Sequence, residues 1–315
     1  MTASLYEIAL GPDKSQRAVV DAITCEAPIL RDLPMEPSSH GLWNIYESMK
    51  DVTGGDLVDL DAPLPKVSAE SELKQTDLSI IGGEMEVGED TARKLGGPVS
   101  YFAKKATPVL RKTGMSAERS LLYDNFRAFA IRNGNVQSAG GTGTKNYSIL
   151  CVHYVPGEIT GVYDPAGFGN GKTFDLTPIA GGELYKNAEG RLVYGMRLKT
   201  YFGVQLANPD YVSAIVNCDI DSDSTSARTF PTMRQMDKLL IDARAGQNTF
   251  IFCHPAVKAY LGTTCKLEHM TLVSGNGFST QIDAWNGVPR QRHRNRRFSL
   301  NLKGMHHEFF QSNLV

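Results

Sequence analysis

Long apolar runs and export signals are missing from this sequence. No stretch approaches the roughly 18 consecutive apolar residues that a membrane-spanning helix requires. The N-terminus has neither the basic nor the apolar segment of a secretory signal. The 5 cysteines are scattered, odd in number and without a C-x-x-C pair, which favours reduced cytosolic thiols over a disulfide framework. We therefore expect no membrane partner.

An excess of one charge sign is also missing, because the net charge is only −1. This argues against a dedicated nucleic-acid-binding domain, which is usually strongly basic. The charges are nevertheless unevenly distributed along the chain. Residues 1–90 hold 6 basic and 18 acidic residues, and residues 91–315 hold 27 basic and 16 acidic residues. Either the acidic part is simply solvated, or it packs on the basic part of another copy and favours self-assembly.

A nucleotide-binding loop is only weakly suggested. Residues 166–173 read A-G-F-G-N-G-K-T and fit a loose phosphate-loop pattern. That chemistry needs a helix directly after the lysine, whereas Pro178 and the Gly181-Gly182 pair follow. We therefore interpret the segment as a glycine-rich surface loop and predict no cofactor.

Metal and catalytic patterns are equally weak. A zinc site could be assembled from Cys253, His254, Cys265 and His269, and a calcium loop could begin at Asp219, Asp221 and Asp223. The first set lacks the spacing of a known finger or ribbon, and the apolar residues 250–252 favour a core role for Cys253. The second lacks the glycine and final glutamate of the loop, so a solvated strand end is favoured. Because G-x-S-x-G is absent too, we expect neither a metal site nor an enzyme.

Residues 41–88 are acidic and poor in core material. Nine acidic residues fall between positions 51 and 86, and the apolar residues Leu57, Leu60 and Leu64 are isolated. So long a segment is unusual inside a compact domain, because long loops generally carry function or bind elsewhere. We predict an extended β-hairpin or arm. Six acidic side chains are its candidate contacts with another subunit: Asp51, Asp56, Asp59, Asp61, Glu70 and Glu72.

The remainder predicts a mixed α+β fold without regular βαβ alternation. Pro98 starts a long helix over residues 98–124, with Val99, Phe102, Val109 and Leu110 on its apolar stripe. Residues 133–146 form a glycine-rich loop. Strands are expected at residues 148–154, 159–163, 192–204, 212–218, 249–253, 270–273 and 279–285, and helices at 234–243 and 255–261.

An alternating arginine run follows residue 289. On an extended strand, side chains two residues apart share one face. Such a face either is solvated or contacts an acidic neighbour or phosphates. Its four arginines are Arg290, Arg292, Arg294 and Arg296.

The order of several motifs resembles that of a known family. These motifs are Leu122-Tyr-Asp-Asn-Phe126, residues 139–149, residues 161–167, Gly181-Gly182, Tyr194, residues 200–206, Asp210-Tyr211-Val212, residues 215–219 and Trp285-Asn-Gly-Val-Pro289. The sequence is similar to the major capsid proteins of short-tailed bacteriophages of the epsilon-fifteen kind, which have the Hong Kong 97-type fold. The family usually continues with G-I-P-I-R and an Asp, where this chain enters its arginine run.

The resemblance implies five regions and a structural role. The regions are an N-terminal arm (1–40), an extended acidic loop (41–88), a peripheral domain with the spine helix (89–132), an axial domain with returning peripheral strands (133–289) and a basic tail (290–315). The implied function is self-assembly of hexamers and pentamers into the icosahedral shell of a virion, put together in the host cytoplasm. A cement or decoration protein, a scaffold, a portal and non-specifically held DNA are the implied partners. A soluble enzyme or ligand-binding domain with an acidic arm stays the alternative.

Overall fold

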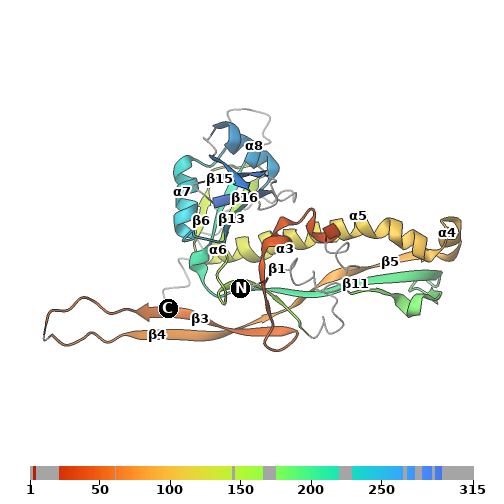
Figure 1. Cartoon of the computed structure of the whole chain (residues 1–315), viewed down its shortest axis with the longest axis horizontal. Coiled ribbons are helices and arrows are strands. Elements are labelled where there is room, and N and C mark those ends of the chain that lie inside the picture. The colour runs from red at the N-terminus through yellow and green to blue at the C-terminus, as the bar shows by residue number, and fades with distance from the viewer. Residues whose placement is uncertain are drawn as a thin grey trace. The chain divides into compact units, whose positions relative to one another are not determined.

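The chain folds into two compact units that each combine helices and strands. A computed structural model describes residues 3–4, 21–60, 62–143, 146–165, 175–219, 229–264, 268–273, 279–285 and 288–292 (Figure 1). Unit 1 comprises residues 1–117 and 154–208, and unit 2 comprises residues 118–153 and 209–315. The mixed α+β class expected from the sequence is confirmed.

Unit 1 is built around the long strand β11 (Leu192–Leu206). One edge of β11 pairs antiparallel with β5 (Ser79–Gly88), and the other pairs with β10 (Tyr185–Lys186), β9 (Asp175–Pro178) and β8 (Ile159–Tyr163). The sheet continues through β2 (Pro34–Pro37) to β1 (Ala3–Ser4). Short helices of this unit include α3 (Pro28–Asp32), α4 (Glu89–Lys94) and η2 (Ile179–Gly182).

The expected acidic arm is a β-hairpin followed by a sheet strand. β3 (Trp43–Thr53) and β4 (Ser68–Asp77) pair only with each other among the described strands, and residues 54–67 join them (Figure 1). The last part of the predicted segment is β5, which belongs to the unit 1 sheet. Gly82 does not interrupt this strand. It allows close pairing, because a side chain there would overlap the carbonyl oxygen of Leu198.

The predicted long helix is present as α5 (Pro98–Arg119), and Pro108 lies within it. Phe102 and Leu110 are 5% and 3% exposed, as predicted. Val99 and Val109 are 81% and 39% exposed, so their assignment to the buried stripe is wrong. Phe102 packs with Val87 of β5 and with residues of β11, which places the helix on its own unit's sheet.

The predicted helix end at residue 124 is wrong. The helical chain continues through the π-helix η1 (Ser120–Arg127) into α6 (Ala128–Arg132). Leu122 and Phe126 of η1 are fully buried. The wide π turn keeps these residues in the core of unit 2, and their burial outweighs the turn-forming tendency of the Asp-Asn pair at positions 124 and 125.

Unit 2 holds a second sheet with helices on both faces. Its strand order is β14 (Glu268–Val273), β15 (Ser279–Trp285), β16 (Val288–Arg292), β13 (Thr249–Cys253), β7 (Tyr147–His153), β12 (Val212–Cys218) and β6 (Val136–Ser138). One face packs on α7 (Met233–Asp242) and α8 (Pro255–Thr264), and η1 also contacts β7 and β12. Central strands covered on both sides are buried along their length, as β7 and β12 are.

Most element predictions in unit 2 hold, with two corrections. Strands 212–218, 249–253 and 279–285 have the predicted bounds. The glycine-rich segment is not loop throughout, because β6 pairs parallel with β12. The arginine run is not all tail, because β16 extends through Arg292 and pairs with β13. The segment 166–173 lies outside the described residues.

Candidate assembly surface

The β3–β4 hairpin is fixed at its base to the rest of unit 1. The buried amide of Asn44 donates a hydrogen bond to Gln205 Oε1 (2.9 Å), and Ser48 Oγ donates to the carbonyl of Ala207 (2.7 Å). Tyr46 donates a longer bond to the carbonyl of Leu206 (3.4 Å). Because these three residues alternate along β3, one face of the hairpin base is anchored. Beyond Ser48 both strands are exposed.

One face of the hairpin carries most of its large apolar side chains, together with the polar residues Glu47, Ser71 and Gln75. The register pairs Ile45 with Gln75, Glu47 with Leu73 and Met49 with Ser71, so these residues lie on one face. A bulge at Lys50 shifts the register, and Val52 then falls on that same face. Its apolar side chains are largely exposed: Ile45 38%, Met49 57%, Val52 62% and Leu73 74%. We call these four residues the apolar hairpin face.

The opposite face is acidic. Ser48 pairs with Glu72, and after the bulge Asp51 pairs with Glu70. Glu72 forms a surface ion pair with Lys50 (3.3 Å). Asp51 and Glu70 form no ion pair with any described residue, although they stand directly opposite each other. We call Asp51, Glu70 and Glu72 the acidic hairpin face.

The connection between the two strands exposes leucines and aspartates together. Leu57 and Leu60 are fully exposed, and Leu64 is 80% exposed. Asp56 and Asp59 are exposed too, while the candidate Asp61 lies outside the described residues. A soluble monomer rarely shows so many bare large apolar side chains in one stretch, which is typical of an interaction site.

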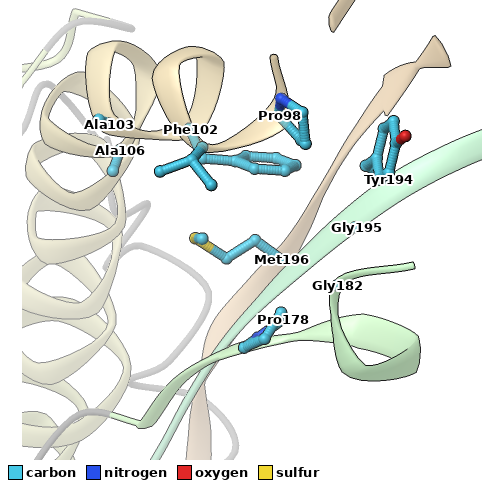
Figure 2. Close-up of a pocket in the computed structure, with 10 residues that line it drawn as sticks. Pro98, Phe102, Ala103, Ala106, Pro178, Gly182, Tyr194, Gly195 and Met196 are labelled. Atoms are coloured by element: carbon cyan, nitrogen blue, oxygen red, sulfur yellow. The ribbon is translucent and has the colours of Figure 1, made fainter. Parts of the chain in front are cut away.

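An apolar groove lies along the start of α5. Pro98, Val99, Phe102, Ala103 and Ala106 form its helical side, with Pro178, Gly182, Tyr194, Gly195 and Met196 opposite (Figure 2). Its volume is about 260 Å³. Figure 2 shows the ring of Phe102 directed from the helix toward the strand that carries Met196. Lys104 and Lys105 are exposed on the same helix. Unit 1 therefore offers an apolar groove and a basic helix face as well as the hairpin.

A hydrogen-bond cluster on the unit 1 sheet changes the ionisation of one carboxyl group. Glu86 of β5 accepts hydrogen bonds from Asn187 Nδ2 (3.0 Å) and from the hydroxyl of Tyr185 (2.8 Å). Both bonds favour the charged form, so they lower the pKa of Glu86. Desolvation and the bond to Glu86 raise the pKa of Tyr185 to about 12.

The structure describes only two of the four arginines of the C-terminal run. Arg290 and Arg292 occupy alternate positions of β16, so the backbone places them on one face, as predicted for an extended strand. Arg294 and Arg296 lie outside the described residues. Whether any of these arginines meets the acidic hairpin face stays a prediction.

The residues considered as metal ligands also differ in whether the structure supports their predicted environment. Cys253 is fully buried in the unit 2 core, as predicted, and its neighbour Cys218 has a pKa raised to about 12 by burial. Asp219 is only 8% exposed, so the interpretation of a solvated strand end is wrong for it. Asp221, Asp223 and Cys265 lie outside the described residues, as does the side chain of His269. Within the described ranges no cluster of three His, Cys, Asp or Glu side chains could hold a metal.

None of the helices in the described part of the chain is both long and apolar enough to cross a lipid bilayer.

Comparison with known proteins places the fold. No protein-family profile and no curated protein sequence matches the chain. Among solved structures, bacteriophage Epsilon15 matches over 85% of this chain and 87% of its own, with a TM-score of 0.54 and 14% identity. The capsid of bacteriophage JBD30 matches over 86% and 91%, with a TM-score of 0.46 and 9% identity. The encapsulin SrpI of Synechococcus elongatus matches over 61% and 88%, with a TM-score of 0.41 and 12% identity.

The likeness to Epsilon15 covers nearly the whole of both chains. The chain has the Hong Kong 97-type fold found in phage capsids, which confirms the fold that the motif order implied. At 14% identity the likeness concerns the fold alone.

Proposed function

We propose that this chain is the major capsid protein of a tailed bacteriophage and assembles into an icosahedral shell around double-stranded DNA. The observation that carries the proposal is the structural likeness to bacteriophage Epsilon15 over 85% of the chain. The hairpin supports the proposal independently, because its base is anchored and both of its faces are exposed, which suits it to contact another copy of the chain. In a closed shell such contacts are heterologous: they join different surfaces and close by rotation into rings, here hexamers and pentamers.

The acidic candidates have a defined role in this proposal. Asp51, Asp56, Asp59, Asp61, Glu70 and Glu72 contact a basic surface of a neighbouring subunit. The arginines at positions 290, 292, 294 and 296 and the basic face of α5 are the candidates for that surface. Supporting this, Asp51 and Glu70 have no cationic partner among the described residues of their own chain. Their charge is better compensated across a subunit boundary than within the hairpin.

The remaining proposals follow from a shell role. The protein is a virion component, assembled in the host cytoplasm. Its partners are other copies of itself, packaged DNA held by non-specific contacts, and a cement or decoration protein, scaffold and portal. The proposal assigns it no catalytic, cofactor or metal-dependent step.

Electron microscopy of the expressed protein tests the proposal. We expect rings or closed particles of uniform size from the full chain. A shortened variant that replaces residues 49–71 with Asn-Gly retains the anchoring residues Asn44, Tyr46 and Ser48. It should keep its far-UV circular dichroism but form no closed particles. A small fixed oligomer from the full chain would contradict the shell function. Closed particles from the shortened variant would contradict only the role of the hairpin in assembly, and would leave the shell function standing.

A further inference from the structure

Unit 2 contains buried side-chain oxygen atoms without hydrogen-bond donors, and they lie close to an acidic residue. Asn146, the last residue of the glycine-rich loop, is 2% exposed, and Asp219, just after β12, is 8% exposed. The Asn146 side-chain oxygen Oδ1 has no hydrogen-bond partner. Within the described part of the chain, the Asp219 carboxylate also accepts no side-chain or backbone hydrogen bond and forms no ion pair. A buried acceptor without a donor is costly, so the Asn146 oxygen needs an explanation.

Both oxygens face the same space, beside Gly143. A methyl group at position 143 would overlap Asp219 Oδ2 and would lie 3.5 Å from Asn146 Oδ1. The missing side chain at Gly143 therefore leaves a space that both the carboxylate and the amide oxygen border. Two acceptors that border one space repel each other unless a donor or a cation lies between them.

The orientation of the amide is fixed by its other atom. Asn146 Nδ2 donates to the carbonyl of Gly141 (3.3 Å), which directs Oδ1 away from that bond. Asn217 repeats the arrangement: its Nδ2 donates to Ser138 Oγ (3.3 Å), and its buried Oδ1 has no partner. The backbone of Asn217 has a positive φ of 62°, a conformation that carries strain for a residue other than glycine.

The loop is also fastened to β12 by backbone bonds. The amide of Gly141 donates to the carbonyl of Asn217 (2.9 Å), and the amide of Ala139 donates to that of Val216 (2.8 Å). Thr229 and Asp219 exchange two further bonds, Thr229 N to the Asp219 carbonyl (2.8 Å) and Asp219 N to Thr229 Oγ1 (3.2 Å). The acceptors are therefore held by a defined framework rather than by a single side chain.

We propose that Asp219 and Asn146 bind a hard divalent cation of the calcium type beside Gly143. Carboxylate, amide and backbone carbonyl oxygens are the ligands that calcium takes, in flexible geometry and with water completing the shell. Magnesium suits the site less, because it demands near-ideal octahedral geometry and sheds its water reluctantly. The bound cation ties the glycine-rich loop to the end of β12.

Thermal unfolding of the full-length protein tests the site without reference to shell assembly. After treatment with EDTA, calcium chloride should raise Tm by several degrees, and magnesium chloride should raise it less. Calorimetric titration should find about one calcium ion per chain. The isosteric variant Asp219→Asn should lose the calcium-dependent shift. A matched control, Asp242→Asn in α7, removes one negative charge from the same unit. This control should keep the calcium-dependent shift in Tm.

A second variant keeps the proposal testable if Asp219→Asn folds poorly. Asn146→Asp places two carboxylates beside Gly143, so it should lower Tm in EDTA and enlarge the rise produced by calcium. A wild-type Tm that is independent of calcium would overturn the proposal, because water or no ligand would then satisfy the site. An equal calcium shift in wild type and Asp219→Asn would place the cation elsewhere and would overturn it as well.

Discussion

Asp51 on β3 stands directly opposite Glu70 on β4, in an exposed hairpin where neither carboxylate has a cationic partner among the described residues. Directly opposed side chains in an antiparallel pair have their Cβ atoms about 4.5–5.5 Å apart, and like charges at this distance destabilise the pair. Lys50, displaced by the bulge, pairs instead with Glu72. The hairpin of an isolated chain thus holds an unfavourable charge pair that a basic surface on another copy would relieve.

Replacing Asp51 with lysine should therefore have opposite effects on folding and on assembly. Lysine opposite Glu70 converts repulsion into attraction, so the free energy of unfolding of the unassembled protein should be unchanged or higher by about 0.2–1 kcal/mol. Assembly should weaken, since the neighbouring surface loses an acidic partner. Chemical denaturation and light scattering measure the two effects. Glu183→Lys, an exposed change in a loop of unit 1, makes the same charge change and should alter neither. Equal assembly of Asp51→Lys and wild type would count against the charged contact.

The hairpin shows how far the sequence could be interpreted. Its length, acidity and sparse apolar content predicted an extended arm, because composition directly records the lack of a core. The two faces could not be predicted, because they depend on the register and on the bulge at Lys50. The exposed Val99 and the continuation of the helix beyond residue 124 were missed for a similar reason. Periodicity marks an apolar stripe, but tertiary packing decides which part of it is covered.

The polar group around Asp219 was missed for a different reason. A glycine-rich loop and an alternating Asp run were visible in the sequence, but nothing in their spacing brings Asn146 and Asp219 together. Their position on either side of Gly143 comes from the pairing of β7 with β12 and from the backbone hydrogen bonds of the loop to β12. Long-range pairing of this kind leaves no local pattern.

Gly82 and Gly83 should respond in opposite ways to alanine. The Cβ of Gly82→Ala would overlap the Leu198 carbonyl oxygen, which is backbone and cannot move without disturbing the pairing of β5 with β11. We expect a loss of about 1–3 kcal/mol, comparable to overpacking of a core. A Cβ on Gly83 meets no atom within 4 Å, so Gly83→Ala should stay within about 0.5 kcal/mol of wild type. Urea unfolding of both variants provides the measurement. Equal losses of stability in the two variants would show that the close pairing at Gly82 does not determine the cost of adding a side chain.

Glu86 should contribute a pH-dependent part of the stability of unit 1. The pKa of Glu86 is lowered in the folded protein by hydrogen bonds from Asn187 and Tyr185. A lowered pKa stabilises the folded state above the ordinary glutamate pKa, and this contribution is lost as pH falls through the folded-state pKa. Wild type should therefore exceed Glu86→Gln in stability at pH 7, and the difference should vanish toward pH 3. The control Glu183→Gln should show no such trend. A difference that stays constant from pH 7 to pH 3 would exclude this linkage.

Substitutions on the buried side of α5 should affect folding, and substitutions on its basic side should affect assembly. Phe102 is 5% exposed and packs on Val87 and Met196, so Phe102→Ala should lower the free energy of unfolding by about 3–5 kcal/mol. Lys104 and Lys105 are exposed, and replacing both with alanine should change stability by less than about 1 kcal/mol.

The double lysine variant should nevertheless assemble poorly, because the basic helix face is a candidate partner for the acidic hairpin face. Added salt should weaken wild-type assembly intermediates for the same reason, since charges farther apart than about 8 Å are largely screened at physiological ionic strength. Val109→Ala, on the exposed side of the helix, is a control that should affect folding far less than Phe102→Ala. Denaturant unfolding and particle yield separate the two roles. A silent Phe102→Ala together with a double lysine variant that fails to fold would reverse the assignment of the two faces, because the basic side of the helix would then be the one that packs on the sheet.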